Sequence, residues 1–174
     1  MDLTPKLQTK RFTLSPLQAS DIPALTHAAA DPLIWEQHPA KDRWKADVFE
    51  PYVTWLLAQG GTLTIRSAAG MAKGMSRFYQ TPDIAPDWGI GFTFLTRDLW
   101  GGTANAEVKG AMIDHLAAQG ANAVWLHFAP DNTRSLRATG KLGATRAEDE
   151  VVDYGFGPSR NARMVIFPKT NFAS

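Results

Sequence analysis

The stretch from Leu99 to Glu107 constrains this chain most, because it joins an apolar strand pattern to the start of a helix. At its centre lies Trp100-Gly101-Gly102, and a glycine pair lets backbone N–H groups approach an anion closely. The start of a helix adds partial positive charge to those donors. The stretch therefore predicts a site for a phosphate-bearing cofactor, although two glycines before a helix also occur in loops that bind nothing.

A second helix start follows the next strand. The strand is expected over 123–128, and Asp131 to Ser135 then opens a helix that ends at 141–144. Asn132 is a good N-cap and Gly143 a good residue to follow a helix, so both also have a purely structural explanation. The succession of the two junctions is more specific than either junction alone.

This part of the chain resembles the acetyl-CoA-binding half of the GNAT acetyltransferase superfamily. The resemblance lies in the order of its parts: a strand, a helix that opens with W-G-G-x-x-N-x-E, a second strand, a helix that opens with N-x-x-S, and then K-L-G-A. More narrowly, the chain is similar to the ribosomal-protein-alanine acetyltransferases, and the resemblance covers nearly the whole chain. The matching residues are Trp100, Gly101, Glu107, Asn132, Ser135, Lys141, Leu142 and Gly143. The chain departs from the family at Thr103, which replaces a glycine, at Asn105, which replaces a small residue, and at Ala144, which replaces phenylalanine.

The composition limits the remaining possibilities. With 174 residues, 44% of them hydrophobic, the chain suits one domain over residues 1–174. Its 18 basic and 17 acidic residues give a net charge of +1, which makes no electrostatic case for nucleic acid or membrane as a partner. It has no cysteine and no histidine at metal-ligand spacing, so no disulfide or metal site is expected. Without a signal core or a run of about 18 apolar residues, we expect a cytoplasmic protein, either monomeric or homodimeric.

Hydrophobic periodicity and turn residues predict the order of the elements. Strands are expected over 11–17, 62–66, 74–79, 88–95 and 123–128, and in two closing stretches, 145–154 and 164–167, separated by a polar loop at 157–161. Further helices are expected from 21 to 30 with Ser20 as N-cap, over 48–57, and from Gly102 to Gly120. The resulting fold class is α+β, a GNAT-like central mixed, mostly antiparallel sheet flanked by helices.

The resemblance also implies which residues hold acetyl-CoA. The strand end Phe94-Leu95-Thr96 would offer backbone groups to the acetyl and pantetheine portions. The loop from Trp100 to Asn105 would hold the pyrophosphate with its amides, and the Thr103 hydroxyl would add a donor. The loop's other residues are Gly101, Gly102 and Ala104. On the second helix, the resemblance assigns Asn132 and Ser135 to the site. One face of this helix carries Arg134, Arg137 and Lys141. This face either binds the ribose phosphate, with Arg137 as the preferred contact, or is a solvated surface.

Acetyl transfer from a thioester to an amine needs a neutral amine, donors for the developing oxyanion and a proton for the leaving thiolate. By resemblance, Ser135 is the residue that protonates the thiolate, and the tyrosine used in other members appears here as Thr139. The strand position at which many relatives carry a glutamate base appears to hold Gly89. Residue type alone offers Asp87, Glu36 and His38 as substitutes, and Asp87 is the expected catalytic base.

These features favour an acetyl-CoA-dependent N-acetyltransferase that acts on a primary amine. At pH 7 an α-amine costs about 1.4 kcal/mol to deprotonate and a lysine amine about 4.6 kcal/mol, so an α-amine is the easier acceptor. Protein N-termini, amino acids and small amines such as aminoglycosides are the candidate acceptors. Two alternatives stay open: a CoA-binding regulatory module without turnover, and an interaction domain whose partner surface is formed by Trp35, Trp44 and Trp55.

Overall fold

The computed structural model of the protein describes residues 1–168, in which eight strands form one sheet. The strand order is β1-β2-β3-β4-β5-β6-β8-β7, and every neighbouring pair is antiparallel except β5 and β6, which are parallel. The strands are β1 (Leu7–Gln8), β2 (Phe12–Pro16), β3 (Thr62–Ser67), β4 (Ala72–Tyr79), β5 (Trp88–Leu95), β6 (Val124–Phe128), β7 (Thr145–Asp153) and β8 (Pro158–Ile166). This mixed, mostly antiparallel sheet confirms the predicted fold class.

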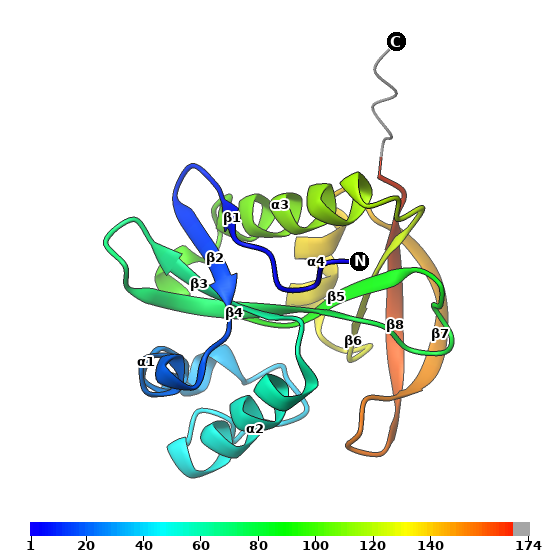
Figure 1. Ribbon diagram of the computed structural model, residues 1–174. Coiled ribbons are helices and arrows are strands. Elements are labelled where there is room, and N and C mark those ends of the chain that lie inside the picture. Colours follow the sequence, from blue (N-terminus) through cyan, green and yellow to red (C-terminus); the bar gives the residue numbers. More distant parts are fainter. Residues whose placement is uncertain (169–174) are drawn as a thin grey trace.

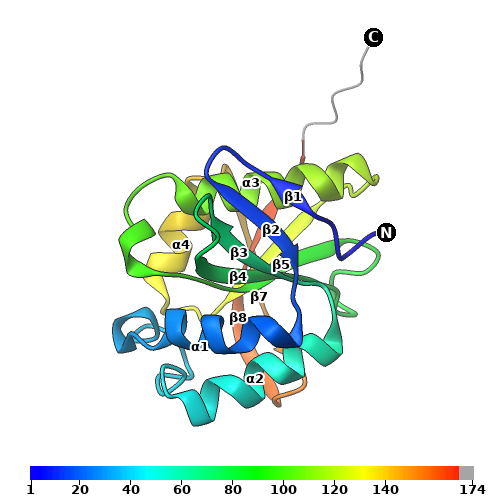
Figure 2. The same ribbon diagram turned by 60° about the vertical axis from the view of Figure 1, so that its left-hand side comes forward.

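Helices cover both faces of the sheet. They are α1 (Ile22–Ala29), α2 (Ala46–Gln59), α3 (Ala104–Ala118) and α4 (Thr133–Gly140), with short 3₁₀ turns at Ala19–Asp21, Pro32–Ile34 and Arg97–Leu99. Figures 1 and 2 show α3 on one face, with α1 and α2 on the other. Each face has its own apolar core: Val108 and Leu116 of α3 belong to one, and Leu25 of α1 and Leu56 of α2 belong to the other.

The helices that cover the sheet follow the expected spacing. In α2, Phe49, Val53 and Leu56 are fully buried, and in α3 Val108 and Met112 are as well, because residues three or four apart share one face of a helix. Gly120, with φ +89°, follows the end of α3 in a conformation that favours glycine. The positions of both helices therefore confirm the sequence prediction.

The two parallel strands at the centre of the sheet separate soon after they begin. β5 and β6 pair only at Trp88↔Val124 and Gly89↔Trp125, although both strands continue beyond these residues. On its other side, β5 pairs with β4 through a register shift between Met75 and Arg77, and Phe92 has a positive φ of 53°. Such an irregularity bends a strand. A gap therefore opens between β5 and β6 in the middle of the sheet.

Two local predictions are wrong. Ser20 is not the N-cap of α1, because a 3₁₀ turn precedes the helix and the Asp21 carboxylate accepts from Gln18 N at 3.0 Å. The polar loop expected at 157–161 lies earlier, at Tyr154 to Gly157. Here the Asp153 carboxylate accepts from Gly155 N at 2.7 Å and closes the turn, so Pro158 already begins β8. The strand β1 was not expected.

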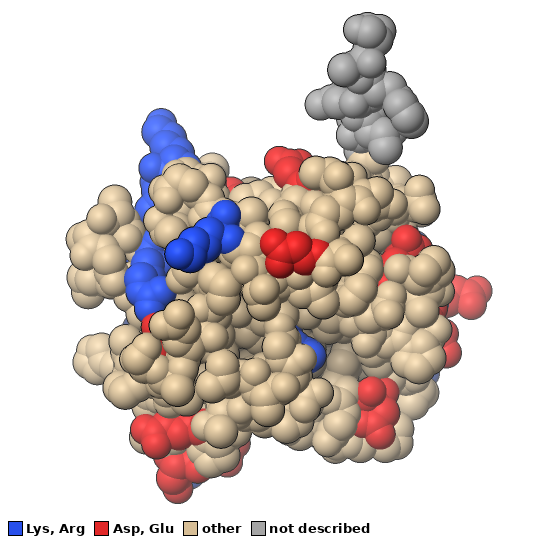
Figure 3. Space-filling view, viewed as in Figure 1, with Lys and Arg blue, Asp and Glu red and all other residues tan. Residues whose placement is uncertain are grey.

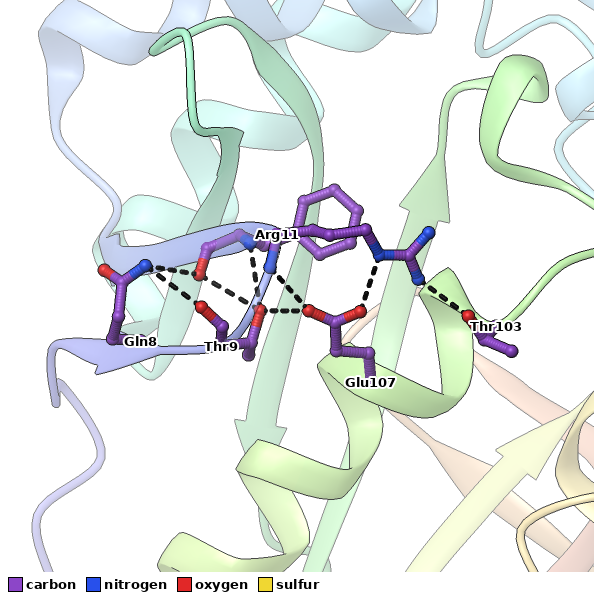
Figure 4. Close-up of polar contacts among 6 residues, drawn as sticks. Gln8, Thr9, Arg11, Thr103 and Glu107 are labelled. Atoms are coloured by element: carbon purple, nitrogen blue, oxygen red, sulfur yellow. Dashed lines mark hydrogen bonds and ion pairs between the residues drawn. The ribbon is translucent and has the colours of Figure 1, made fainter.

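Glu107 joins the first turns of α3 to the β1–β2 turn, as Figure 4 shows. Its carboxylate accepts hydrogen bonds from Thr9 Oγ1 at 2.6 Å, from Arg11 N at 2.7 Å and from Arg11 Nε at 2.7 Å. Arg11 Nη2 also donates to Thr103 Oγ1 at 2.9 Å. Desolvation raises the pKa of Glu107, but the hydrogen bonds from Thr9 and Arg11 outweigh it and lower the pKa overall. The structure thus gives Glu107 an anchoring contact.

We predict that Glu107→Gln lowers the free energy of unfolding by about 1 kcal/mol at pH 7, because a partly exposed ion pair and its hydrogen bonds are lost. A lowered carboxyl pKa stabilises the fold above the unfolded pKa, and this stabilisation is lost as pH falls through the folded pKa. The difference from wild type should therefore shrink in acid. Urea unfolding of both proteins, with the exposed Glu50→Gln as control, measures it. An undiminished difference in acid would contradict the anchoring role of the charge.

Candidate active site

A cavity of about 1110 Å³ lies where β5 and β6 separate. Its walls come from β5 and β6, from the starts of α3 and α4, from the segment 34–43 and from the turn between β7 and β8. Ligand cavities in proteins commonly measure about 300–1000 Å³. The volume therefore suits an elongated ligand together with a second, smaller one.

The start of α3 forms one end of this cavity. Gly101, Gly102, Asn105 and Ala106 line it. The bond from Glu107 N to Thr103 O, at 2.9 Å, is the first of the helix, so the amides before it have no acceptor within the helix. Such amides and the helix dipole together bind anions. The predicted phosphate loop thus faces the cavity.

The ring of Trp100 is fixed beside this loop. Trp100 Nε1 donates to Leu95 O at 3.0 Å, and the Arg134 guanidinium lies 4.0 Å from the centre of the indole ring. Arg134 also donates to Ile34 O at 2.8 Å. These contacts join the end of β5, the start of α4 and the segment that follows α1 around the cavity.

The start of α4 meets the start of α3 across the cavity. Asn132 is 7% exposed, and its Oδ1 accepts from Ser135 N at 3.0 Å, which confirms Asn132 as the N-cap. Asn132, Ser135, Arg137 and Lys141 all line the cavity. The fold therefore brings together the two motifs that the sequence singled out.

Of the other residues expected to bind the cofactor, some line the cavity and some do not. Phe94, Leu95 and Trp100 line the cavity, whereas Thr96, Thr103 and Ala104 are not among its lining residues. Thr96 N donates to Lys73 O at 2.9 Å, within the sheet, and Ala104 is buried. Thr103 Oγ1 accepts from Arg11 Nη2 at 2.9 Å, a contact that joins the Thr103 side chain to the β1–β2 turn. The sequence prediction for Thr103 did not include this contact with Arg11.

Asp87, the expected catalytic base, lies apart from the residues that line the cavity. Asp87 precedes β5 at the end where β5 and β6 still pair, and it is not among the residues that line the cavity. Its Oδ1 accepts from Ala123 N at 3.3 Å, next to the start of β6. Through this hydrogen bond, Asp87 connects the start of β5 to the start of β6. Asp87 was chosen by residue type alone, and residue type does not reveal at which end β5 and β6 separate.

The other two substitutes, Glu36 and His38, do line the cavity. Glu36 is half exposed and lies 3.8 Å from Arg134. Burial and the charges of Arg43 and Arg134 lower the pKa of His38 to about 4, and its Nδ1 accepts from Ala40 N at 3.0 Å. His38 is therefore neutral at pH 7, with one ring nitrogen already engaged.

An aromatic wall occupies the part of the cavity that faces β7 and β8. Its rings belong to Trp35, Tyr52, Tyr79, Phe92, Tyr154 and Phe156. A Cβ atom on Gly89 would lie 2.3 Å from Tyr79 Cζ, so the Tyr79 ring fills the space of a side chain at that position. Tyr79 Oη lies 3.0 Å from His127 Nδ1, and burial raises the pKa of Tyr79. No glutamate can take that position while the ring stays where it is.

Sequence reasoning missed Lys109. It is buried in α3, and its Nζ lies 2.6 Å from Thr93 Oγ1 and 3.3 Å from Ser76 Oγ. Lys109 also lines the cavity. The signal was present in the sequence, because Lys109 shares the helical spacing of the apolar Ile113 and Leu116, a place where a charged residue is unusual.

On the face of the molecule seen in Figure 3, most of the visible Lys and Arg side chains gather toward the upper left, and Asp and Glu lie mainly toward the right and the lower edge. Within residues 1–168 no helix has the length and apolar character needed to span a membrane. Over the same range, no group of three potential metal-binding side chains is close enough to hold an ion.

Residues 11–145 match the family described as Acetyltransferase (GNAT) domain. No curated protein sequence matches the chain. Among solved structures, a GNAT-family acetyltransferase from Bacillus anthracis has a TM-score of 0.74 at 12% identity, covering 94% of this chain and 98% of that one. A GCN5-related N-acetyltransferase from Brucella melitensis has a TM-score of 0.76 at 14% identity, covering 94% and 78%.

A third structure is RimL, a ribosomal L7/L12 α-N-protein acetyltransferase in complex with coenzyme A. Its TM-score is 0.71 at 16% identity, and the alignment covers 94% of this chain and 98% of that one. At these identities the structures share the fold, and the family assignment rests on the match of residues 11–145. Because that match spans most of the sequence, the chain belongs to the GNAT acetyltransferase family.

Proposed function

We propose that this acetyltransferase transfers the acetyl group of acetyl-CoA to an α-amine, that of a protein N-terminus or of an amino acid. The observation that carries the proposal is the single cavity that joins the starts of α3 and α4 to an aromatic wall. One end offers backbone donors for phosphate, and the other offers apolar surface for an acceptor. We further propose one domain over residues 1–174 that acts in the cytoplasm as a monomer or homodimer.

The residues at the gap fit acetyl-CoA, which supplies an activated acetyl thioester. The amides of Gly101 and Gly102 would take the pyrophosphate, and Arg137 and Lys141 line the same cavity as partners for a ribose phosphate. Beyond its two pairs with β6, the edge of β5 at Phe94 and Leu95 faces the gap, where its backbone groups can bind an extended pantetheine chain. The coenzyme A bound to RimL supports this choice.

An α-amine is the acceptor whose deprotonation costs the least free energy in this site. No glutamate stands at Gly89, and an α-amine loses its proton about 3 kcal/mol more easily than a lysine amine at pH 7. Arg43 lies 3.8 Å from the centre of the Tyr52 ring in the aromatic wall, and its charge disfavours a polycation such as an aminoglycoside. RimL is named as an α-N-protein acetyltransferase, which agrees with the narrower resemblance.

A panel of acceptors tests this function through the release of free thiol from acetyl-CoA. We expect turnover with peptides that carry a free α-amine, and rates at least tenfold lower with the same peptides when the α-amine is blocked and only a lysine is free. Aminoglycosides should react poorly. Faster reaction of lysine or an aminoglycoside would refute the α-amine assignment. Binding of acetyl-CoA without thiol release from any amine would instead indicate a regulatory module.

Ser135 is the proposed proton donor to the departing thiolate. It lines the cavity in the first turn of α4, and the cap of this helix uses its backbone N–H, which leaves the hydroxyl available for another role. A proton delivered to the thiolate matters in the transition state and adds little to the binding of the intact thioester.

We predict that Ser135→Ala lowers turnover by up to about 10²-fold and leaves the affinity for acetyl-CoA nearly unchanged. Stability should also change little, because alanine keeps the N–H that Asn132 accepts. Turnover and cofactor titration are measured on the same folded preparation. Thr133→Ala is the matched control, since Thr133 lies in the same turn but is not among the residues lining the cavity. Normal turnover of Ser135→Ala would remove Ser135 from the mechanism.

A further inference from the structure

Lys109 is a charged residue in an unusual position. It is 5% exposed, and it extends from α3 toward β4 and β5, where it contacts Ser76 and Thr93. None of the ion pairs formed by residues 1–168 includes it. Buried lysines normally have a carboxylate partner. Lys109 instead has two hydroxyl groups as hydrogen-bond partners, and it also lines the cavity.

The hydrogen bonds around Lys109 Nζ decide which of its positions are used. Thr93 Oγ1 donates to Gly91 O at 3.2 Å, and Ser76 Oγ lies 2.7 Å from Thr93 Oγ1. With the Thr93 proton committed, Ser76 donates to Thr93, and both hydroxyl oxygens accept from Lys109 Nζ. Two N–H groups of Lys109 are thereby used. The remaining position on the nitrogen is a third N–H when the amine is charged and a lone pair when it is neutral.

The surroundings favour the neutral amine. Burial lowers the pKa of Lys109 to about 7, and no charged neighbour contributes to the shift. The elements packed against Nζ present only the hydroxyls of Ser76 on β4 and Thr93 on β5. Other titratable side chains lie elsewhere on the cavity wall: Glu36, His38, Arg43, Tyr79, His127, Arg134, Arg137, Lys141 and Tyr154. Near pH 7 the amine can therefore both accept and release a proton.

We propose that Lys109 is a catalytic residue, whose Nζ accepts the first proton of the acceptor ammonium directly or through one water molecule. This inference rests on the proposed function. The freed amine attacks the thioester carbonyl, so that a C–N bond forms and the C–S bond breaks. The second proton of the amine passes to the departing thiolate through Ser135. Lys109 releases its own proton to water, and the net products are the amide, the thiol and one proton.

The other candidate bases fit this step less well. The Tyr79 ring fills the position at Gly89, and Asp87 is not among the residues lining the cavity. The pKa of His38 is about 4, far below that of an amine. A base with a pKa near 7 takes a proton from an α-amine at a cost of about tenfold, against more than about 10³-fold for a lysine amine. Lys109 would thus contribute to the preference for α-amines.

The test compares Lys109→Met with wild type on two acceptors, a peptide α-amine and an alkoxyamine that is already neutral at the assay pH. Because only the α-amine needs a base, we expect kcat/KM to fall about 10²-fold or more for the α-amine and less than about tenfold for the alkoxyamine. Ile113→Met controls for packing on the same flank of α3. Equal losses on both acceptors, or normal turnover with the α-amine, would overturn the proposal for Lys109 alone.

A second measurement does not depend on turnover. A lysine whose folded pKa is lowered destabilises the fold when it is protonated, so the stability that it contributes increases as pH rises through the folded pKa. Wild type should therefore gain thermal stability relative to Lys109→Met between about pH 7 and pH 10. A constant difference over this range would show an ordinary lysine and overturn the proposal.

Mass spectrometry and the wild-type assay complete the test. Acetylation of Lys109 by acetyl-CoA alone would make its nitrogen a nucleophile and would also overturn the proposal. Failure of the wild-type protein to release thiol with every amine would refute the proposed function, and the role of Lys109 with it. The variants therefore separate failure of the residue from failure of the function.

Discussion

The early separation of β5 and β6 is the constraint on which the site depends. A parallel pair that continued beyond Gly89↔Trp125 would fill the middle of the sheet with backbone hydrogen bonds and leave no room for a ligand. The irregular stretch around Phe92 bends β5 away from that pairing. Both functional helix starts then face the gap, because α3 follows β5 and α4 follows β6 at the ends where the strands are farthest from their last pair.

The segments around the gap are held in place by side chains that connect parts of the chain far apart in sequence. The Glu107 carboxylate fixes the start of α3 to the β1–β2 turn, and Arg134 connects α4 to Ile34 while it covers the Trp100 ring. These contacts hold the anion-binding amides in place before any ligand arrives. A site arranged in advance avoids the entropic cost of ordering a loop during binding.

The sequence predicted the fold and the two helix starts because motifs at Trp100 and Asn132 are local: spacing, capping and glycine positions decide them. It failed where the answer depended on distant segments. It did not reveal that Arg11 contacts the Thr103 hydroxyl oxygen, and strand order did not show that Asp87 lies at the end where β5 and β6 stay paired. Lys109 was missed because the helix was analysed through its apolar residues, while the partners of Lys109 come from β4 and β5.

The start of α3 is the proposed binding site for the phosphates of acetyl-CoA, and calorimetric titration of Gly102 variants with acetyl-CoA tests this assignment. A Cβ atom at Gly102 meets no other atom within 4 Å and the residue has no positive φ, so a side chain can begin there without a backbone clash. We predict near-normal affinity for Gly102→Ala and a loss of at least about tenfold for Gly102→Asp, because a carboxylate beside phosphate is repelled. Equal affinity of folded Gly102→Asp and wild type would place the phosphates of acetyl-CoA away from the start of α3.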